Sequence, residues 1–242
     1  MAADEGVEQH AAVGDESAVA TVDPADGRST RWHDHRAARR ETLMHATRRA
    51  VHRLGPDLSM DELASELGTS KSILYRYFTD KAGLQDAVGE GVVEAIRATL
   101  DLASQDAPTP RASLEAMVLA YLQMIERSPS VYYFVTRNAP VATSVVKPAT
   151  GSVTAQSAPL SDFMHSVVAL VARPYAAEVG GYDQGLVDAW AAGAVGFVSA
   201  TGEWWLARRH EPGTPDAAEA AAQITAWLWA GPIGLLAPRT TT

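Results

Sequence analysis

The chain has 242 residues, and its content of 47 % hydrophobic and 20 % charged residues is that of a globular protein rather than a wholly disordered one. It has no cysteine, which excludes disulfides, Cys-ligated zinc and a cysteine nucleophile. No apolar run reaches the ~18–20 residues that cross a bilayer, and the first residues lack a signal-peptide pattern. We therefore expect a cytoplasmic protein that does not bind a membrane.

The net charge of −9 is unevenly distributed along the chain. Residues 1–27 carry seven acids and no Lys or Arg, whereas residues 28–55 carry eight arginines and two acids, a net charge of +6. Because residues 1–30 show no hydrophobic period, we expect them to form a disordered acidic tail. An acidic chain is poorly suited to coat nucleic acid, but this basic segment leaves room for one basic face.

Four helices are predicted after the tail. A buried stripe at helical spacing predicts the first over residues 34–54. Ser59, followed three residues later by Glu62, forms a capping-box pattern that starts the second, and Gly68 ends it. Thr69 or Ser70 is then expected to cap a third helix, "KSILYRYF", and Thr79 or Asp80 to cap a fourth over residues 81–102.

The rest of the chain also shows helical periodicity, broken by Pro and Gly. Helices are predicted near residues 111–127, 129–138, 159–178, 184–209 and 215–230. No sustained alternation of apolar and polar residues predicts a strand. The sequence therefore predicts an all-α protein.

The third helix has two different sides. At 100° per residue, one outward arc contains Lys71, Ser72, Tyr75 and Arg76, and the opposite side contains Ile73, Leu74 and Tyr77. Two short helices joined by a Gly-Thr-Ser turn, the second with a cationic outer side, are typical of a helix-turn-helix that binds DNA. The alternative is an ordinary amphipathic surface helix, but no acid occurs between Gly68 and Thr79.

The stretch "MDELASELGTSKSILYRYFTDKAGL" resembles the DNA-binding signature of the tetracycline-repressor (TetR) family. The likeness lies in the Gly turn, the Leu-Tyr-x-x-Phe core and the Lys that opens the fourth helix. The resemblance implies a three-helix helix-turn-helix DNA-binding domain over residues 31–82. It also implies a helical effector-binding and dimerisation domain over residues 83–242, and a homodimer that binds a palindromic double-stranded DNA operator.

Nine residues are expected to contact DNA: Arg36, Ser59, Ser70, Lys71, Ser72, Tyr75, Arg76, Tyr77 and Lys81. Ser59 can offer its hydroxyl or the amides of its helix end to a phosphate, and Arg36 can lie along the backbone or in the minor groove. Tyr75 and Lys81 match family positions that bind phosphates, and Lys71, Ser72 and Arg76 match positions that face the major groove. Tyr77 faces inward on the wheel, but the family often uses this position for the DNA backbone.

Two features suggest what the C-terminal helices do. Small residues at Gly193, Gly196 and Ala200 suit close helix packing in a dimer. Aromatic and methionine side chains suit an apolar ligand cavity, although plain core is the alternative for each. The residues expected to contact a small hydrophobic effector are Met117, Tyr121, Met124, Tyr133, Phe134, Phe163, Met164, Trp190 and Phe197.

No catalytic motif and no cofactor-binding motif is present, and the "WHDH" stretch has no further metal ligand nearby in sequence. We therefore expect neither an enzyme nor a bound cofactor or metal. The sequence predicts a ligand-responsive repressor. The alternatives are a DNA-binding regulator without an effector, and a helical lipid-binding protein or enzyme.

Overall fold

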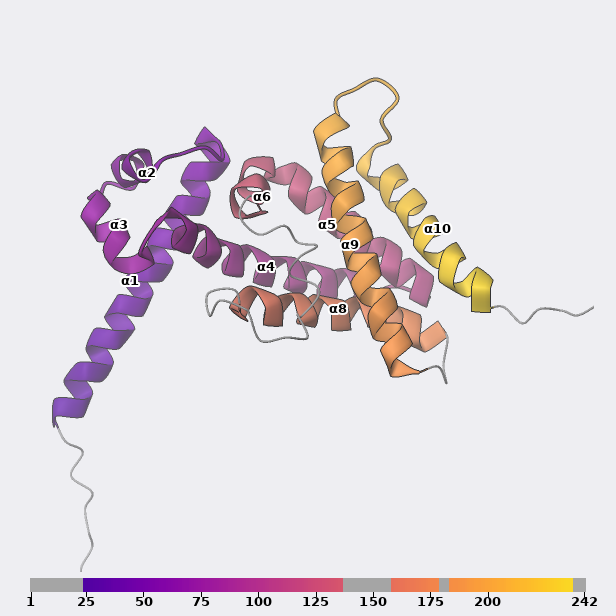
Figure 1. Ribbon diagram of the computed structural model, residues 1–242, viewed down its shortest axis with the longest axis horizontal. Helices are drawn as coiled ribbons and strands as arrows, with labels where there is room; N and C mark the ends of the chain where they lie inside the picture. The colour runs from indigo at the N-terminus through magenta and orange to yellow at the C-terminus, as the bar shows by residue number, and fades with distance from the viewer. Residues whose placement is uncertain (1–23, 137–157, 179–182, 237–242) are drawn as a thin grey trace, which may run out of the picture. The chain divides into compact units, whose positions relative to one another are not determined.

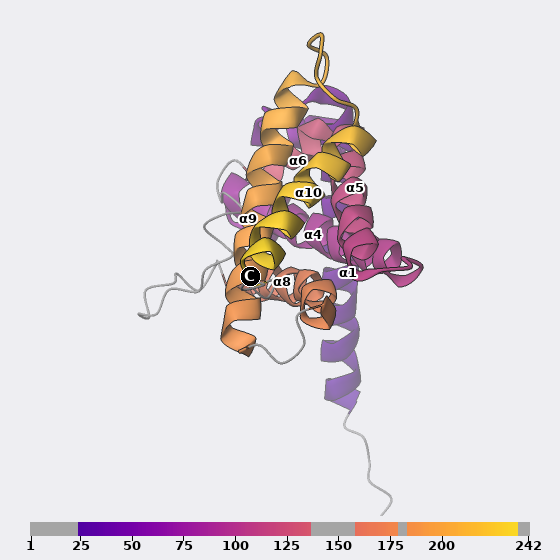
Figure 2. The ribbon, with the colours of Figure 1, turned by 90° about the vertical axis from the view of Figure 1, so that its right-hand side faces the viewer.

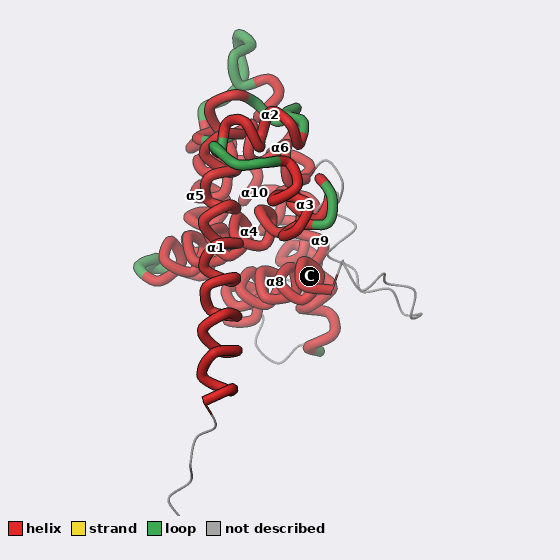
Figure 3. Tube along the Cα trace, turned by 90° about the vertical axis from the view of Figure 1, so that its left-hand side faces the viewer, coloured by secondary structure: helices red, strands yellow, loops and turns green. Residues whose placement is uncertain are grey.

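The computed structural model describes residues 24–136, 158–178 and 183–236 (Figure 1). Within these residues the secondary structure is helical and no strand occurs, which confirms the all-α prediction (Figure 3). The helices are α1 (Pro24–Leu54), α2 (Met60–Glu66), α3 (Lys71–Phe78), α4 (Lys81–Gln105), α5 (Pro110–Arg127), α6 (Pro129–Thr136), α8 (Ala158–Glu178), α9 (Gln184–Arg208) and α10 (Ala217–Leu236). None of the described helices is long and apolar enough to cross a membrane.

The chain divides into two units, Met1–Arg39 and Arg40–Thr242. In the first unit, α1 begins at Pro24, ten residues before the predicted start, and it takes in seven residues that we expected in the acidic tail. Proline is well tolerated at the first helical position because no intrahelical bond needs its missing N–H. The periodicity argument missed this part of the helix because residues 24–33 carry no apolar stripe. Residues 1–23 of the predicted tail lie outside the described residues.

In the second unit, the turns between α2, α3 and α4 are fixed by capping side chains. The Ser59 hydroxyl accepts from the amide of Glu62 at 3.2 Å, and the Glu62 carboxylate accepts from the Ser59 amide at 2.8 Å, which completes the predicted capping box. Ser70 caps α3 and Asp80 caps α4. Gly68 adopts φ +60°, a conformation that costs glycine little and ends α2.

Two apolar clusters hold the second unit together. The first packs α1, α2, α3 and the start of α4 around Leu63, Leu74 and Phe78, and we call it the DNA-domain cluster after the domain that the sequence predicts there. The bundle cluster packs the rest of α4 with α5, α8, α9 and α10 around Met117 and Leu206. Helix α4 therefore belongs to both clusters, and so does the short helix α6.

Helices α9 and α10 lie side by side at one side of the bundle (Figures 1 and 2). A Cβ placed on Gly202 of α9 would lie 2.9 Å from Cε1 of Tyr121 on α5, so a glycine is required where these helices approach. Gly193 and Gly196 on the same helix have no neighbour within 4 Å of such a Cβ. The small residues of α9 thus serve two faces: Gly202 packs inside the chain, while the other two leave a smooth exposed strip.

Candidate DNA-binding surface and ligand cavity

Helix α3 is anchored by Leu74 and Phe78, which are buried in the DNA-domain cluster. The outer side of the helix is exposed as the wheel predicted, and it carries Lys71, Ser72, Tyr75 and Arg76. That these side chains contact DNA stays a prediction.

Two residues of α3 differ from the inward positions that the wheel gave them. Ile73 is 37 % exposed, because the anchoring strip of this short helix is only as wide as the pair Leu74 and Phe78. Tyr77 is half-buried, and its ring is tilted against Phe78 at a centroid distance of 6.4 Å. Part of Tyr77 is therefore accessible, as a contact with the DNA backbone requires.

Lys71 is paired with a carboxylate of the preceding helix. Its Nζ lies 2.6 Å from Oδ2 of Asp61, and both side chains are largely exposed. This hydrogen bond, assisted by the charge of Asp61, raises the pKa of Lys71. The sequence analysis did not anticipate this pair, because Asp61 lies in the first turn of α2, ten residues before Lys71, and only the packing of α2 against α3 brings the two together.

The hydrogen-bond donors of Ser59 are also already used within the protein. Its hydroxyl and its amide both bond Glu62, and these hydrogen bonds hold the pKa of that carboxyl below its usual range. A phosphate at the start of α2 must therefore displace the Glu62 carboxylate. The Ser70 hydroxyl only accepts a hydrogen bond, from the Ile73 amide at 3.3 Å, so its own proton can be donated to a phosphate.

The remaining predicted DNA contacts lie in different places. Lys81 is half-buried at the first position of α4. Arg36 is exposed on the part of α1 that belongs to the first unit, and its contact with DNA stays a prediction.

Arg40 was not among the predicted DNA contacts. It lies in the second unit, with its guanidinium 5.5 Å from the ring centroid of Phe78, so it helps to fix α3 against α1.

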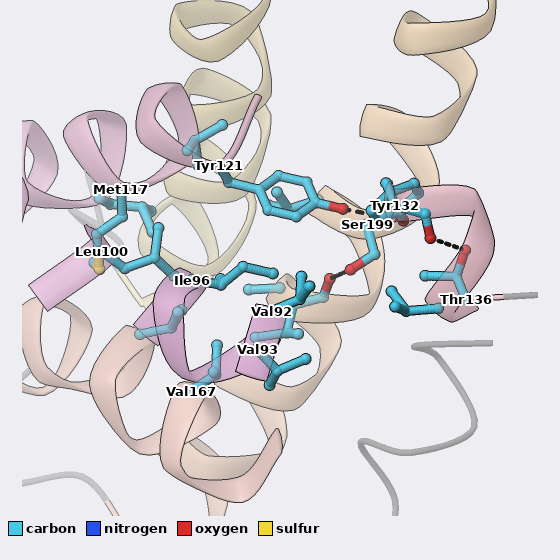
Figure 4. Close-up of a pocket in the computed structure, with 17 residues that line it drawn as sticks. Val92, Val93, Ile96, Leu100, Met117, Tyr121, Tyr132, Thr136, Val167 and Ser199 are labelled. Atoms are coloured by element: carbon cyan, nitrogen blue, oxygen red, sulfur yellow. Dashed lines mark hydrogen bonds between the residues drawn. The ribbon is translucent and has the colours of Figure 1, made fainter. Parts of the chain in front are cut away.

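A cavity of about 90 Å³ lies inside the bundle cluster (Figure 4). Five helices line it: α4, α5, α6, α8 and α9. Its walls are mostly aliphatic, and four hydroxyl groups are the polar side-chain groups among the described lining residues. The lining residues are Val92, Val93, Ile96, Leu100, Leu114, Met117, Val118, Tyr121, Tyr132, Val135, Thr136, Val167, Val171, Ala194, Val195, Val198 and Ser199.

Of the nine predicted effector residues, Met117 and Tyr121 line this cavity. Phe134 instead fills the DNA-domain cluster, and Met124 and Tyr133 are half-buried away from the cavity wall. Phe163 and Met164 are in α8, but their side chains lie outside the described residues.

Trp190 and Phe197 are seven residues apart on α9 and were expected to point into the same interior, but neither lines the cavity. Trp190 stacks on Tyr175 with ring centroids 4.1 Å apart. Phe197 is exposed and meets Trp227 of α10 edge to face at 6.1 Å. The spacing fixes which residues share a face, but the neighbouring helices decide where that face points.

The polar end of the cavity is a chain of hydrogen bonds that reaches the surface. The Tyr121 hydroxyl donates to the Tyr132 hydroxyl at 3.2 Å, which donates to the Glu203 carboxylate at 2.8 Å (Figure 4 shows the first of these bonds). Burial raises the pKa of Tyr121 to about 12, and burial also raises the pKa of Tyr132. Both tyrosines are therefore neutral at physiological pH.

An apolar surface runs along α9 and α10. Besides Gly193 and Gly196, it contains the exposed side chains of Phe197 and Trp204 on α9 and Trp227 on α10. Single exposed apolar residues are common, but neighbouring aromatic residues beside a strip of small ones indicate a protein contact.

Comparison with known proteins agrees with this arrangement. Residues 43–88 match the family model described as bacterial regulatory proteins, tetR family. Residues 79–232 match the model described as Tetracyclin repressor-like, C-terminal domain. An HTH-type transcriptional regulator of Mycobacterium tuberculosis is 32 % identical over 182 residues, which cover 75 % of this chain and 73 % of the relative.

Solved structures share the fold at low identity. A TetR-family transcriptional regulator from Pectobacterium atrosepticum superposes with a TM-score of 0.60 and 23 % identity, covering 84 % of this chain and 96 % of the other. The regulator FadR from Bacillus subtilis, in complex with stearoyl-CoA, gives a TM-score of 0.58 and 11 % identity over 78 % of this chain and 97 % of the other. With both family models matched along most of its length, this chain belongs to the TetR family of DNA-binding transcriptional regulators.

Proposed function

We propose that the protein is a cytoplasmic homodimeric repressor, which leaves a palindromic operator when a largely apolar small molecule binds the cavity. The observation that carries this proposal is the position of α6. Its Val131 and Phe134 are buried in the DNA-domain cluster, while its Tyr132 and Thr136 line the cavity. A molecule that moves the cavity side of this eight-residue helix therefore also moves its other side.

The link from α6 to the DNA-binding helices is a buried one. The Gln85 side-chain amide on α4 donates to the backbone carbonyl of Phe134 at 2.9 Å. Four residues earlier, Lys81 opens α4 directly after the turn that follows α3. A shift of α6 is thus passed to the end of α4 that positions the recognition helix.

Recognition of a palindromic site requires two copies of α3 about 34–36 Å apart, so that they enter successive major grooves. The apolar surface of α9 and α10 is the part of the chain best suited to join two copies. A ligand that binds better to a dimer with another spacing weakens operator binding by its difference in affinity for the two conformations.

The size of the cavity supports a ligand that forces movement. Sites for drug-sized ligands measure roughly 300–1,000 Å³, whereas this one measures about 90 Å³. A larger apolar molecule therefore presses on the lining helices or extends through the open side of the cavity. The FadR structure with stearoyl-CoA supports the view that a protein of this fold can hold a ligand with a long acyl chain.

The test is to select operator fragments from random DNA with the purified protein and to follow binding by fluorescence anisotropy. A panel of acyl chains, steroids and aromatic drugs is then added. Release of the operator by one class of apolar molecule supports the proposal. Operator binding that no panel member changes would favour a regulator without a small-molecule effector. If no DNA is selected at all, a helical lipid-binding protein or an enzyme becomes the better reading.

A further inference from the structure

We propose that the cavity selects a neutral apolar molecule that carries a hydrogen-bond donor, such as an alcohol, and discriminates against ligands whose polar group can only accept. This inference rests on the proposed ligand binding at the cavity, and it names the class of ligand. It follows from the directions of the four hydroxyl protons in the cavity wall.

All four hydroxyl groups already give their protons to protein acceptors. Tyr121 donates to Tyr132, and Tyr132 donates to the carboxylate of Glu203. Ser199 donates to the Val195 carbonyl at 2.8 Å, and Thr136 donates to the Tyr132 carbonyl at 2.9 Å. Each hydroxyl has one proton but two lone pairs, so these oxygens keep the capacity to accept.

The direction of the hydrogen bonds from Tyr121 through Tyr132 is fixed by Glu203, the last acceptor. A carboxylate accepts hydrogen bonds and has none to give, so Tyr132 must point its proton at Glu203. The Tyr132 oxygen is then an acceptor for Tyr121, which turns the Tyr121 proton away from the cavity. Bonds to an ionised acceptor are roughly twice as strong as neutral ones, so reversing this chain is costly.

A ligand alcohol can donate its proton to one of these hydroxyl oxygens, so neither the ligand nor the cavity wall is left without a hydrogen-bond partner. A ketone with the same number of carbons buries an acceptor without a donor, unless it breaks one of the existing bonds. A carboxylate also buries acceptors without a donor. In addition, its negative charge is buried near the end of the cavity where the Glu203 carboxylate accepts from Tyr132. Apolar packing is nearly equal for the three molecules, so the polar group decides between them.

The experiment titrates the full-length protein, without DNA, with 1-octanol, 2-octanone and octanoate by isothermal titration calorimetry. We expect 1-octanol to bind about tenfold more tightly than 2-octanone, because a buried acceptor without a partner is costly. Octanoate should bind least tightly. Val198→Trp, at a half-buried lining position, should block all three by filling the cavity.

Glu203→Gln tests the cause. A glutamine amide can donate to Tyr132, so the whole chain can reverse and the Tyr121 proton can turn into the cavity. The preference for 1-octanol over 2-octanone should then largely disappear. Tyr132→Phe should have the same effect, because it frees the Tyr121 proton. The matched control is Glu178→Gln, an exposed residue at the end of α8 that should leave the preference unchanged.

The outcomes separate the two proposals. If no probe binds, or if Val198→Trp has no effect on binding, the ligand role of the cavity is wrong and this inference fails with it. If the probes bind in the cavity but 2-octanone or octanoate binds as tightly as 1-octanol, only the donor selectivity is wrong. If both Glu203→Gln and Tyr132→Phe keep the full preference, the chain of hydroxyl groups is not its cause, and the inference is wrong.

Discussion

Nζ of Lys71 lies 2.6 Å from Oδ2 of Asp61, so a cation predicted to face the major groove is already paired with a carboxylate of the preceding helix. If Lys71 contacts DNA as predicted, it must leave this partner, and the exposed carboxylate repels nearby phosphates. Asp61 is therefore expected to restrain binding to DNA of any sequence.

We expect Asp61→Asn to strengthen binding to non-operator DNA and to steepen the slope of log affinity against log salt by about one unit, as for one added phosphate contact. Anisotropy titrations on operator and scrambled DNA at several salt concentrations measure both effects. Asp101→Asn is the charge-matched control, because Asp101 pairs with Arg173 at 3.1 Å in the bundle helices. Equal slopes for the two variants would show that the charge of Asp61 does not restrain DNA binding.

Arg76 is exposed on α3 and is expected to contact a base edge. Arg76→Ala should lower operator affinity by ~1–3 kcal/mol and relax the preference at one base position. Binding to a set of single-base operator variants measures this loss. Arg111→Ala, an exposed residue of α5, controls for the change in net charge. An unchanged base preference would show that Arg76 does not contact a base edge.

Lys81 is expected to bind a phosphate at the start of α4. Lys81→Ala should weaken binding to operator and scrambled DNA by similar factors, because phosphate contacts carry no sequence information. The salt slope should also shrink by about one unit. Tyr75→Phe should weaken binding to both DNAs too, but with little change in slope because no charge is lost. A Lys81→Ala slope equal to that of the parent protein would contradict the phosphate contact.

Two glycines of α9 separate dimerisation from folding. A leucine Cβ at Gly196 meets nothing within the protomer, so Gly196→Leu should leave each protomer folded but give monomers in analytical ultracentrifugation. Gly202→Ala should lower the free energy of unfolding of the protomer instead, because its Cβ would lie 2.9 Å from the Tyr121 ring. Folded dimers of normal stability for Gly196→Leu would place the dimer contact elsewhere.

Gln85 is expected to couple the cavity to the DNA-binding helices. Gln85→Met keeps the side chain buried but leaves the Phe134 carbonyl without this donor, at a cost of ~1–3 kcal/mol in stability. Operator affinity without a ligand should change little, while release by an active ligand should weaken. Anisotropy with and without that ligand gives the coupling free energy. A coupling equal to that of the parent protein would show that α6 and α4 communicate without this bond.

The sequence was most informative where local chemistry decides the structure. The caps at Ser59, Ser70 and Asp80 mark the starts of α2, α3 and α4, because each side chain satisfies an amide of its own helix. The start of α1 was not predictable in the same way. Its first residues have no apolar face, so no periodic signal marks them.

The residues that line the cavity, by contrast, could mostly not be predicted from the sequence. The predicted effector contacts were chosen by residue type, as aromatic and methionine side chains; Met117 and Tyr121 line the cavity, and their contact with an effector stays a prediction. Most of the wall is valine, isoleucine and leucine, which the sequence cannot distinguish from ordinary core. Which apolar residues face a void depends on how five helices pack, and that is set by contacts between distant parts of the chain.

The double burial of α6 has an evolutionary consequence. Its Val131 and Phe134 support the DNA-domain cluster and its Tyr132 and Thr136 shape the cavity, so a mutation that shifts this helix to admit a new ligand also disturbs the helices that position α3. Val167 on α8 and Val198 on α9 line the cavity without belonging to the DNA-domain cluster. Under the proposed mechanism, a lineage of this protein would therefore acquire a new signal molecule most readily through α8 and α9, while it keeps its operator.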